Sequence, residues 1–170
     1  MSAETITTAL FLITAVVASA VLINAVYPVI QNMAGTFSSS THESDVRIRT
    51  DFKIIATSAS QSSGTAQVWM KNIGSERISL SEIRRADVFC GAVGNFDHLV
   101  YTNTSGSLGD NQWTEEFGTG YDLNANSFWD PGETLKVTAK PKTPIRSENN
   151  VYFQFALPNG IWRSNEFTAS

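Results

Sequence analysis

The sequence has no lysine or arginine before Arg47, although the 170-residue chain contains 12 basic and 16 acidic residues in all. Up to that point the only formal charges are Glu4, Glu43 and Asp45. Charged residues make up 16% of the chain, against about 25% in ordinary soluble domains. Because no basic stripe or polybasic cluster is present, the composition excludes nucleic-acid binding and electrostatic docking on an acidic membrane surface.

Cysteine and histidine are nearly absent as well. Cys90 is the single cysteine, so the chain can form no disulfide within itself. Its place in an apolar run predicts that it packs as a small hydrophobic side chain. The two histidines, His42 and His98, are expected to be ordinary surface residues. The sequence contains no nucleophile elbow, phosphate-binding loop or HExxH motif, and we therefore expect a protein that is not an enzyme.

A long apolar run fills much of the region that lacks basic residues. Residues 6–30 carry no charge and only a few weakly polar side chains. As a helix they would extend roughly 37 Å, which exceeds the about 30 Å of a bilayer's hydrocarbon core. The run is too long for a cleaved secretory signal and has no basic segment before it, and buried helices of soluble proteins seldom lack charge over such a length. It is predicted to be a membrane-spanning helix or, as in pilins, part of a filament core.

The composition divides the chain into an N-terminal helix (residues 1–30), a linker (31–46) and a folded domain (47–170). The Ser/Thr-rich linker is expected to be a flexible stalk or an extension of the helix. Beyond it, apolar and polar residues alternate in short runs and no helical period is visible. The predicted strands are Arg47–Ala56, Ala66–Ile73, Ile78–Ile83, Asp87–Cys90, His98–Thr102, Leu135–Ala139, Val151–Leu157 and Ile161–Phe167.

Short strands at roughly ten-residue spacing are typical of a sandwich. Pro158-Asn159-Gly160 predicts a type I′ hairpin between the last two strands, because Asn-Gly accepts the positive φ angles of that turn. The expected fold is therefore a long N-terminal apolar α-helix followed by an all-β immunoglobulin-like sandwich. The aromatic residues expected to anchor its core are Trp69, Phe89, Phe153, Phe155 and Trp162.

One loop has the spacing of a calcium site. Residues 122–133 read DLNANSFWDPGE, which matches the EF-hand loop except that Ser127 replaces the glycine at position 6. The alternative is that these Asp, Asn and Gly residues only form turns before the next strand. The predicted calcium ligands are the side chains of Asp122, Asn124, Asn126, Asp130 and Glu133 and the backbone carbonyl of Phe128.

A glycosylation sequon, Asn103-Thr104-Ser105, lies in a Gly/Ser/Asn-rich loop. A glycan on Asn103 would place the domain outside the cytoplasm, where millimolar calcium also suits a modest calcium site. Trp113 and Phe117 lie in a polar stretch and are the residues predicted for an interface, with burial in the core as the alternative.

The N-terminal run SAETITTALFLITAVVASAVLINAVYPVI and the motifs VWMKNIGSERIS, ADVFCGAVGNF, FWDPGETLKV and FALPNGIW occur here in one order. Together they resemble the FlaG family of archaeal flagellar (archaellum) accessory proteins, and more distantly FlaF and the archaellins. The resemblance covers nearly the whole chain and rests on the order of the motifs and on the N-terminus.

This resemblance implies a non-enzymatic stator component of the archaellum that is anchored in the cell membrane by one helix. Its sandwich would lie outside the cytoplasm, associate with itself and bind FlaF, which contacts the S-layer. The alternative is an archaellin- or pilin-like filament subunit whose N-terminal helices form the filament core. Archaellins carry a basic leader ending in glycine, and none precedes Glu4 here, which favours the stator. A third interpretation is a membrane-tethered binding module or surface enzyme stabilised by calcium.

Overall fold

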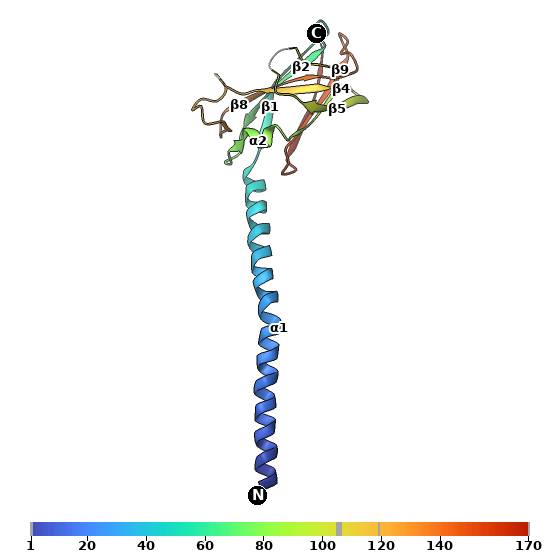
Figure 1. Cartoon of the computed structure of the whole chain (residues 1–170). Helices are drawn as coiled ribbons and strands as arrows, with labels where there is room; N and C mark the ends of the chain where they lie inside the picture. The colour runs from blue at the N-terminus through green and yellow to red at the C-terminus, as the bar shows by residue number, and fades with distance from the viewer. Residues whose placement is uncertain (1, 105–106, 119, 170) are drawn as a thin grey trace. The chain divides into compact units, whose positions relative to one another are not determined.

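The computed structural model describes residues 2–104, 107–118 and 120–169 of the chain. They form two compact units, Met1–Asp45 and Val46–Ser170. Helix α1 (Ser2–Arg49) is continuous over 48 residues and makes up the described part of the first unit (Figure 1). Residues 31–46 are expected to form either a flexible stalk or an extension of the helix, and in the structure they continue α1. By length and composition α1 can cross a membrane, with a mean hydropathy of 2.5 in its most apolar window.

The threonine and serine hydroxyl groups in the apolar part of α1 are satisfied within the helix. Thr7, Thr8, Thr14 and Ser19 each donate a hydrogen bond to the backbone carbonyl four residues earlier, at 2.8 or 2.9 Å. A hydroxyl bonded in this way needs no other partner. The helix can therefore place these positions in lipid or against another helix without leaving a polar group unpaired.

The described residues of the second unit form an eight-stranded sheet in the order β1-β2-β8-β6-β5-β4-β9-β10. Neighbouring strands are antiparallel except β5 and β6, which pair in parallel through only two residue pairs. The first half-sheet consists of β1 (Phe52–Ser60), β2 (Thr65–Asn72), β8 (Thr134–Lys140) and β6 (Gln112–Glu116). The second half-sheet consists of β5 (Asn95–Tyr101), β4 (Asp87–Ala92), β9 (Asn150–Ala156) and β10 (Trp162–Thr168).

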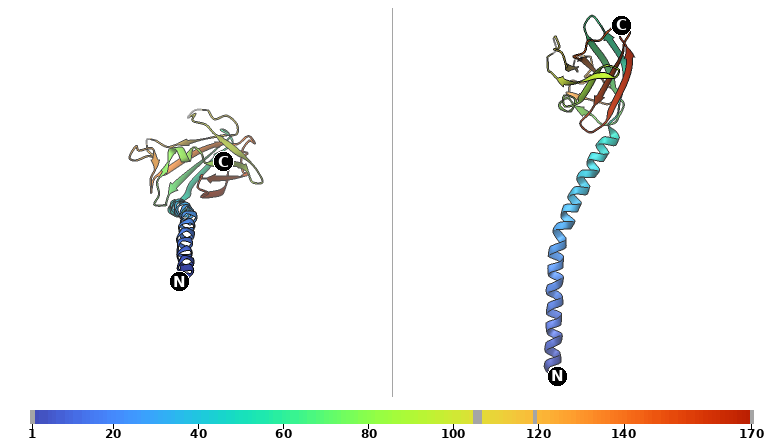
Figure 2. Two further views of the ribbon diagram at one scale, coloured as in Figure 1. Left: turned by 60° about the horizontal axis from the view of Figure 1, so that its bottom comes forward. Right: turned by 90° about the vertical axis from the view of Figure 1, so that its right-hand side faces the viewer.

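The two half-sheets face each other as the layers of a sandwich (Figure 2). Buried and half-buried residues alternate along β2 and β8, as the period of a strand requires. Between the layers, the ring of Phe155 lies edge-on to those of Phe52 and Trp113, with centroids 5.7 and 6.0 Å apart. The core thus joins residues from both half-sheets, and the predicted sandwich fold is confirmed.

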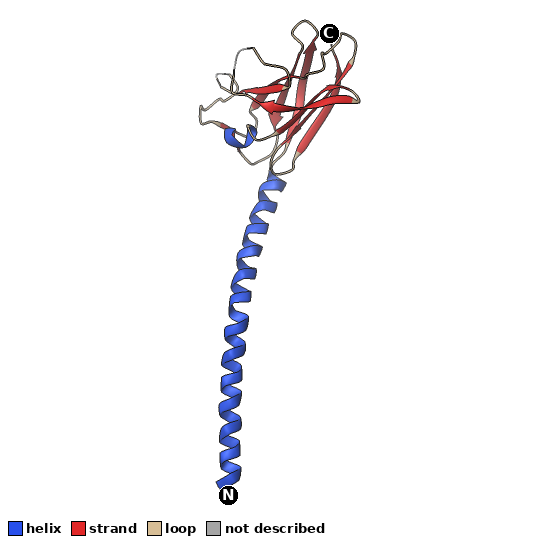
Figure 3. Cartoon of the chain, turned by 45° about the vertical axis from the view of Figure 1, so that its right-hand side comes forward, coloured by secondary structure: helices blue, strands red, loops and turns tan. Residues whose placement is uncertain are grey.

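Two predicted strands are wrong in part. Residues 47–49 end α1, so β1 begins only at Phe52. The run Ile78–Ile83 splits into β3 (Ile78–Ser79) and the short helix α2 (Leu80–Ile83) (Figure 3). Ser79 caps α2 in a capping box with Glu82, whose carboxylate accepts a hydrogen bond from the Ser79 backbone N–H at 3.0 Å. Strand β7 (Phe128–Trp129), the partner of β3, and β6 were not predicted.

The hairpin between β9 and β10 lies where the sequence predicts it but has a different turn. Gly160 has a φ of 82°, whereas Asn159 does not have the positive φ that a type I′ turn requires. The backbone N–H of Gly160 donates to the carbonyl of Leu157 at 2.9 Å. The Asn159 side chain accepts a hydrogen bond from the N–H of Ile161 at 3.1 Å. The N–H of Leu157 donates to the carbonyl of Ile161 at 2.9 Å, so three residues, Pro158 to Gly160, form the turn inside this pair.

The predicted core aromatics divide into three groups. Phe153 and Phe155 are fully buried, as expected. Trp69 and Phe89 are half-buried on the outer faces of the half-sheets. Trp162 was predicted in the core and is instead 53% exposed, because the register of β10 on β9 pairs it with the outward residue Ala156.

Candidate functional site

The Asp122–Glu133 loop is closed at its C-terminal end by a buried carboxylate. Glu133 is 5% exposed, and its two side-chain oxygens accept hydrogen bonds from the backbone N–H groups of Leu123 at 2.8 Å and Asp130 at 2.9 Å. The indole N–H of Trp129 donates to the Glu133 backbone carbonyl at 2.9 Å. Glu133 thus connects both ends of the loop to the core.

Asp122 organises the first half of the loop. Its Oδ1 accepts a hydrogen bond from the Asn126 N–H at 3.3 Å, and its Oδ2 accepts one from the Ser127 N–H at 3.0 Å. Ser127 has a φ of 63°, the left-handed conformation that favours glycine. The residue that departs from the EF-hand pattern therefore still makes the turn for which that pattern uses glycine.

The carboxylate of Asp130 accepts hydrogen bonds from the two asparagine side chains of the loop. The amides of Asn124 and Asn126 each donate to its Oδ2 at 2.7 Å. These hydrogen bonds, first that of Asn124, lower the pKa of Asp130 below its ordinary value, and the charge of Arg77 lowers it further. Arg77 also lies over the ring of Phe128, 4.8 Å from its centroid. The N–H of Phe128 donates to the Asn126 side chain at 2.8 Å.

The structure therefore brings the six predicted ligands into one loop, but each carboxylate also accepts N–H groups. Among the described residues, no three His, Cys, Asp or Glu side chains lie close enough together to hold a metal ion. Calcium binding would need the side-chain amides of Asn124 and Asn126, whose N–H groups bond to Asp130, to turn so that their oxygens face an ion bound beside Asp130. The calcium site stays a prediction.

We expect millimolar Ca²⁺ to raise the melting temperature of the full chain above that in EGTA if the loop binds the ion. Saturation at about 100 times Kd adds about 2.7 kcal/mol to the free energy of unfolding. Asp122→Ala should abolish the difference. Asp110→Ala, which removes an exposed carboxylate outside the loop, should preserve it. Identical melting curves with no calcium found by elemental analysis would contradict the prediction.

Asn103 is exposed, as a glycan acceptor must be, and its side-chain oxygen accepts a hydrogen bond from the Tyr101 hydroxyl at 3.3 Å. Ser105, the third residue of the sequon, lies outside the described residues. Glycosylation of Asn103 stays a prediction.

The histidine and cysteine singled out in the sequence have structural contacts. His98 pairs with Asp87, Nε2 to Oδ1 at 3.0 Å, and its ring lies 4.9 Å from that of Phe89. Cys90 is fully buried, and desolvation raises the pKa of its thiol to about 12. The thiol is therefore protonated at neutral pH, in agreement with a small hydrophobic side chain.

Of the two alternatives for Trp113 and Phe117, an interface or burial in the core, the structure has burial for Trp113, and the interface is wrong there. Trp113 is fully buried between the half-sheets, and Phe117 is partly buried against the same core. Exposed aromatic residues gather instead on the outer face of the second half-sheet, around Phe96 and His98. The sequence of Asn95–Tyr101 could have predicted them, because Phe96 and Val100 alternate with the buried Leu99. Both faces of this strand are therefore partly apolar.

The family model described as archaeal-type flagellin matches residues 2–167. The chain belongs to the archaeal-type flagellin family. This confirms the resemblance to archaeal flagellar proteins that the sequence suggested.

An Archaeoglobus fulgidus protein described as uncharacterized is 27% identical to this archaeal-type flagellin over 170 residues, which is 98% of each chain. Among solved structures, the archaellum periplasmic stator protein FlaG from Sulfolobus acidocaldarius has a TM-score of 0.53 at 23% identity, and covers 69% of this chain and 99% of its own. The complex of FlaF and FlaG from the same organism gives 0.52 at 22% identity, with 68% and 87% covered.

The archaeal flagellum of Methanospirillum hungatei strain JF1 has a TM-score of 0.54 at 15% identity, and the match covers 91% of this flagellin-family chain and 90% of the other. At these identities the three structures establish a shared fold. The Methanospirillum match is long enough to include much of α1, whereas the matches to FlaG are shorter.

Proposed function

We propose that this archaeal-type flagellin is a non-enzymatic structural component of the archaellum that acts as a membrane-anchored stator protein. The observation that carries the proposal is the uncharged stretch of α1, residues 6–30, which is exposed along its length and precedes a sandwich with the FlaG fold. A stator must hold its position against torque. A lipid-embedded helix supplies the anchor, and the sandwich supplies the contacts to other proteins.

The helix also carries one polar position suited to helix–helix contact. Asn24 lies within the apolar run, and Pro28 has no N–H to donate to the Asn24 carbonyl. An asparagine side chain in lipid contributes about 0.6 to 2 kcal/mol when it bonds to a neighbouring helix. Asn24 would favour association of α1 with a second helix.

In this proposal the protein is a single-pass protein of the archaeal cell membrane, and its sandwich lies between the membrane and the S-layer. The sandwich would associate with further copies and with a FlaF partner, which in turn contacts the S-layer. The solved complex of FlaF with FlaG supports such a partner, because both chains act there as one periplasmic stator assembly by its description.

A filament subunit is the second candidate function. The family description and the Methanospirillum flagellum, which matches 91% of the chain, favour it. In a filament, residues 6–30 would pack against copies of themselves instead of lipid.

Deletion of the gene in its archaeal host and shearing of the filaments test both functions. We expect deletion to abolish motility, and the wild-type chain to stay in the membrane fraction after the filaments are sheared off. A chain that is the major subunit of the sheared filaments would contradict the stator and support the filament subunit. Unchanged motility would contradict both and favour a membrane-tethered binding module. Complementation with the wild-type gene is the control.

A further inference from the structure

The outer face of the second half-sheet is unusually aromatic for a surface in contact with water. Phe96, Val100 and Trp162 on this face are 47%, 60% and 53% exposed. Contiguous exposed apolar patches mark interaction sites. The aromatic face comprises the outward residues Phe96, His98 and Val100 of β5, Asp87, Phe89 and Gly91 of β4, Tyr152, Gln154 and Ala156 of β9, and Trp162, Ser164 and Glu166 of β10.

The rings on the aromatic face are held in place by contacts across the strands. Those of Phe96 and Tyr152 lie 4.8 Å apart, on either side of Gly91 in the register. A Cβ atom on Gly91 would lie 2.7 Å from the Cα of Phe96, so only glycine fits. The ring of Phe89 contacts Phe96 edge-on at 6.3 Å. The patch is thus a fixed surface rather than a set of isolated side chains.

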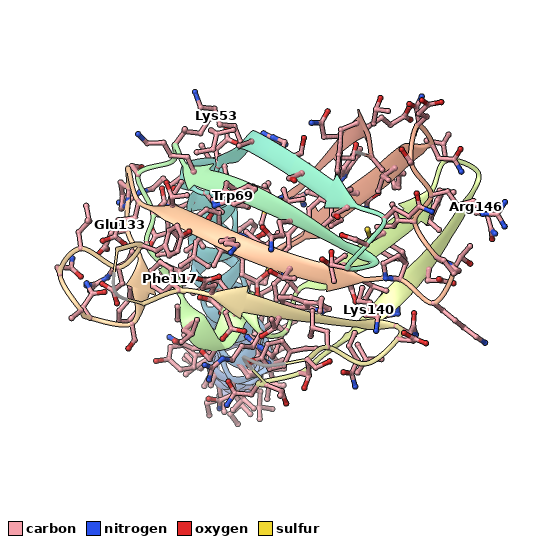
Figure 4. All side chains as sticks on the ribbon, turned by 90° about the horizontal axis from the view of Figure 1, so that it is seen from above. Lys53, Trp69, Phe117, Glu133, Lys140 and Arg146 are labelled. Carbon is pink, nitrogen blue, oxygen red and sulfur yellow. The ribbon has the colours of Figure 1, made fainter. Side chains whose placement is uncertain are left out.

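The outer face of the first half-sheet has the opposite character. Four lysines project from it, and Figure 4 shows Lys53, Trp69 and Lys140 on this half-sheet. We call it the lysine face. Its charged and aromatic residues are Lys53 of β1, Lys71 and Trp69 of β2, Lys136 and Lys140 of β8, and Glu116 of β6.

Lys53 and Lys71 lie in an unfavourable arrangement, whereas the other two lysines of the lysine face have acidic partners. Lys136 and Lys140 bind Glu116 and Asp110, at 2.8 and 3.1 Å. Lys53 and Lys71 are directly opposite each other in the β1–β2 register, and neither has an ion pair within the part of the chain that the structure describes. Like charges directly opposite destabilise a sheet. An acidic surface placed over this pair would relieve the repulsion.

The aromatic face provides such an acidic surface. Its charged residues are Asp87 and Glu166, and the twelve outward residues of its strands include no lysine or arginine. The aromatic face therefore has a formal charge of −2, with His98 neutral. The strands of the lysine face carry four lysines and one glutamate, a formal charge of +3 that becomes +2 when Asp110 beside Lys140 is included. Two aromatic faces, or two lysine faces, would repel each other.

We propose that the aromatic face of one copy packs on the lysine face of a second copy. Sheets pack face to face at about 10 Å, and the aromatic rings would cover Trp69 and the aliphatic stems of the lysines. Because the two surfaces are different, each copy in a pair keeps one free face, so the contact repeats into a ring or an open array and does not close as a two-fold dimer. This inference rests on the proposed self-association in the archaellum and names its surfaces.

Cysteine cross-linking of the full chain in detergent micelles tests the pairing. Ser164→Cys places a thiol on the aromatic face, and Thr138→Cys places one on the lysine face. After oxidation we expect a disulfide-linked dimer from the mixture of the two variants, and none from either variant alone. Cys90 gives no background because it is fully buried. Ser62→Cys, in the exposed β1–β2 turn, is the control and should cross-link with neither variant.

A charge swap tests the electrostatic part. Lys53→Glu with Lys71→Glu in the Thr138→Cys chain should lower the cross-linked yield about tenfold, because like charges then meet. Asp87→Lys with Glu166→Lys in the Ser164→Cys chain should restore it. A dimer of Ser164→Cys alone, no cross-link in the mixture or no rescue by the swap would overturn the proposal. Association through α1 cannot produce the rescue.

The two levels of the proposal fail separately. Loss of motility on deletion without cross-links would reject these surfaces and leave the archaellum function standing. Cross-links and rescue in a protein whose deletion leaves motility unchanged would reject the archaellum function and leave the contact standing.

Discussion

Replacing Trp113 by alanine is expected to lower the free energy of unfolding of the sandwich by about 3 to 5 kcal/mol. Trp113 is fully buried, with its ring 5.1 Å from that of Tyr101 and 6.0 Å from that of Phe155. It also pairs with Tyr101 in the short parallel ladder between β5 and β6, the only one of the described strand pairs that joins the two half-sheets in register. The substitution would therefore leave a cavity beside the strand pair that joins the two half-sheets.

Trp162→Ala is the matched control, since it removes the same side chain from an exposed position on β10. Surface substitutions usually change stability by about 0.5 kcal/mol or less. Urea unfolding of both variants, followed by the fluorescence of the remaining tryptophans, measures the difference. Equal losses in the free energy of unfolding for Trp113→Ala and Trp162→Ala would contradict the burial of Trp113 and favour its role as an interface residue. Trp162→Ala should instead weaken the proposed contact between copies.

The sequence predicts those parts of this fold that depend on local periodicity. Ala66, Val68 and Met70 alternate with polar residues, and all three are buried on one face of β2. The charge-free run before residue 31 is also helical as predicted, although Pro28 lies inside it and removes the hydrogen bond to the Asn24 carbonyl. In such segments the pattern of a few neighbours determines which side faces the core.

The errors arise where distant residues decide the structure. The end of α1 is fixed by residues 26 and 27 positions later, because the N–H groups of Ser75 and Glu76 donate to the Arg49 carbonyl at 2.9 and 3.1 Å. Gly74 permits this approach, since a Cβ there would lie 2.4 Å from the Arg49 oxygen. By contrast, α2 could have been predicted locally, because Ser79 and Glu82 have the spacing of a capping box. The alternating apolar residues of Ile78–Ile83 led to the prediction of a strand instead.

The candidate sites divide in the same way. The spacing of residues 122–133 predicts that its oxygen atoms gather in one loop, and the contacts of Asn124 and Asn126 with Asp130 agree. Glu133 is buried and bonded to two backbone N–H groups because it lies beside β8. The spacing of the loop residues does not predict this position. The aromatic face forms only when β4, β5, β9 and β10 pair, so its residues are scattered from Asp87 to Glu166 in the sequence.

The second large effect is expected for Glu133→Ala, with a loss of about 3 kcal/mol or more in the free energy of unfolding. Each hydrogen bond to a charged group contributes about 1.5 to 3 kcal/mol, and the substitution removes two from a site that is 5% exposed. The N–H groups of Leu123 and Asp130 would then lose their acceptors. Glu133→Gln keeps one acceptor oxygen and should lose less.

Urea unfolding in EGTA separates this structural role from calcium binding. Glu116→Ala is the control, because its carboxylate is 57% exposed and bonded to Lys136, and such surface ion pairs contribute about 1 kcal/mol or less. If the large loss at Glu133 persists in EGTA, the carboxylate stabilises the loop without an ion. Calcium, if it binds, then adds to a loop that is already formed. A loss that appears only with calcium present would contradict the hydrogen-bonded role and make Glu133 primarily a ligand. Because both backbone donors are present whether or not calcium binds, we expect the loss in both conditions.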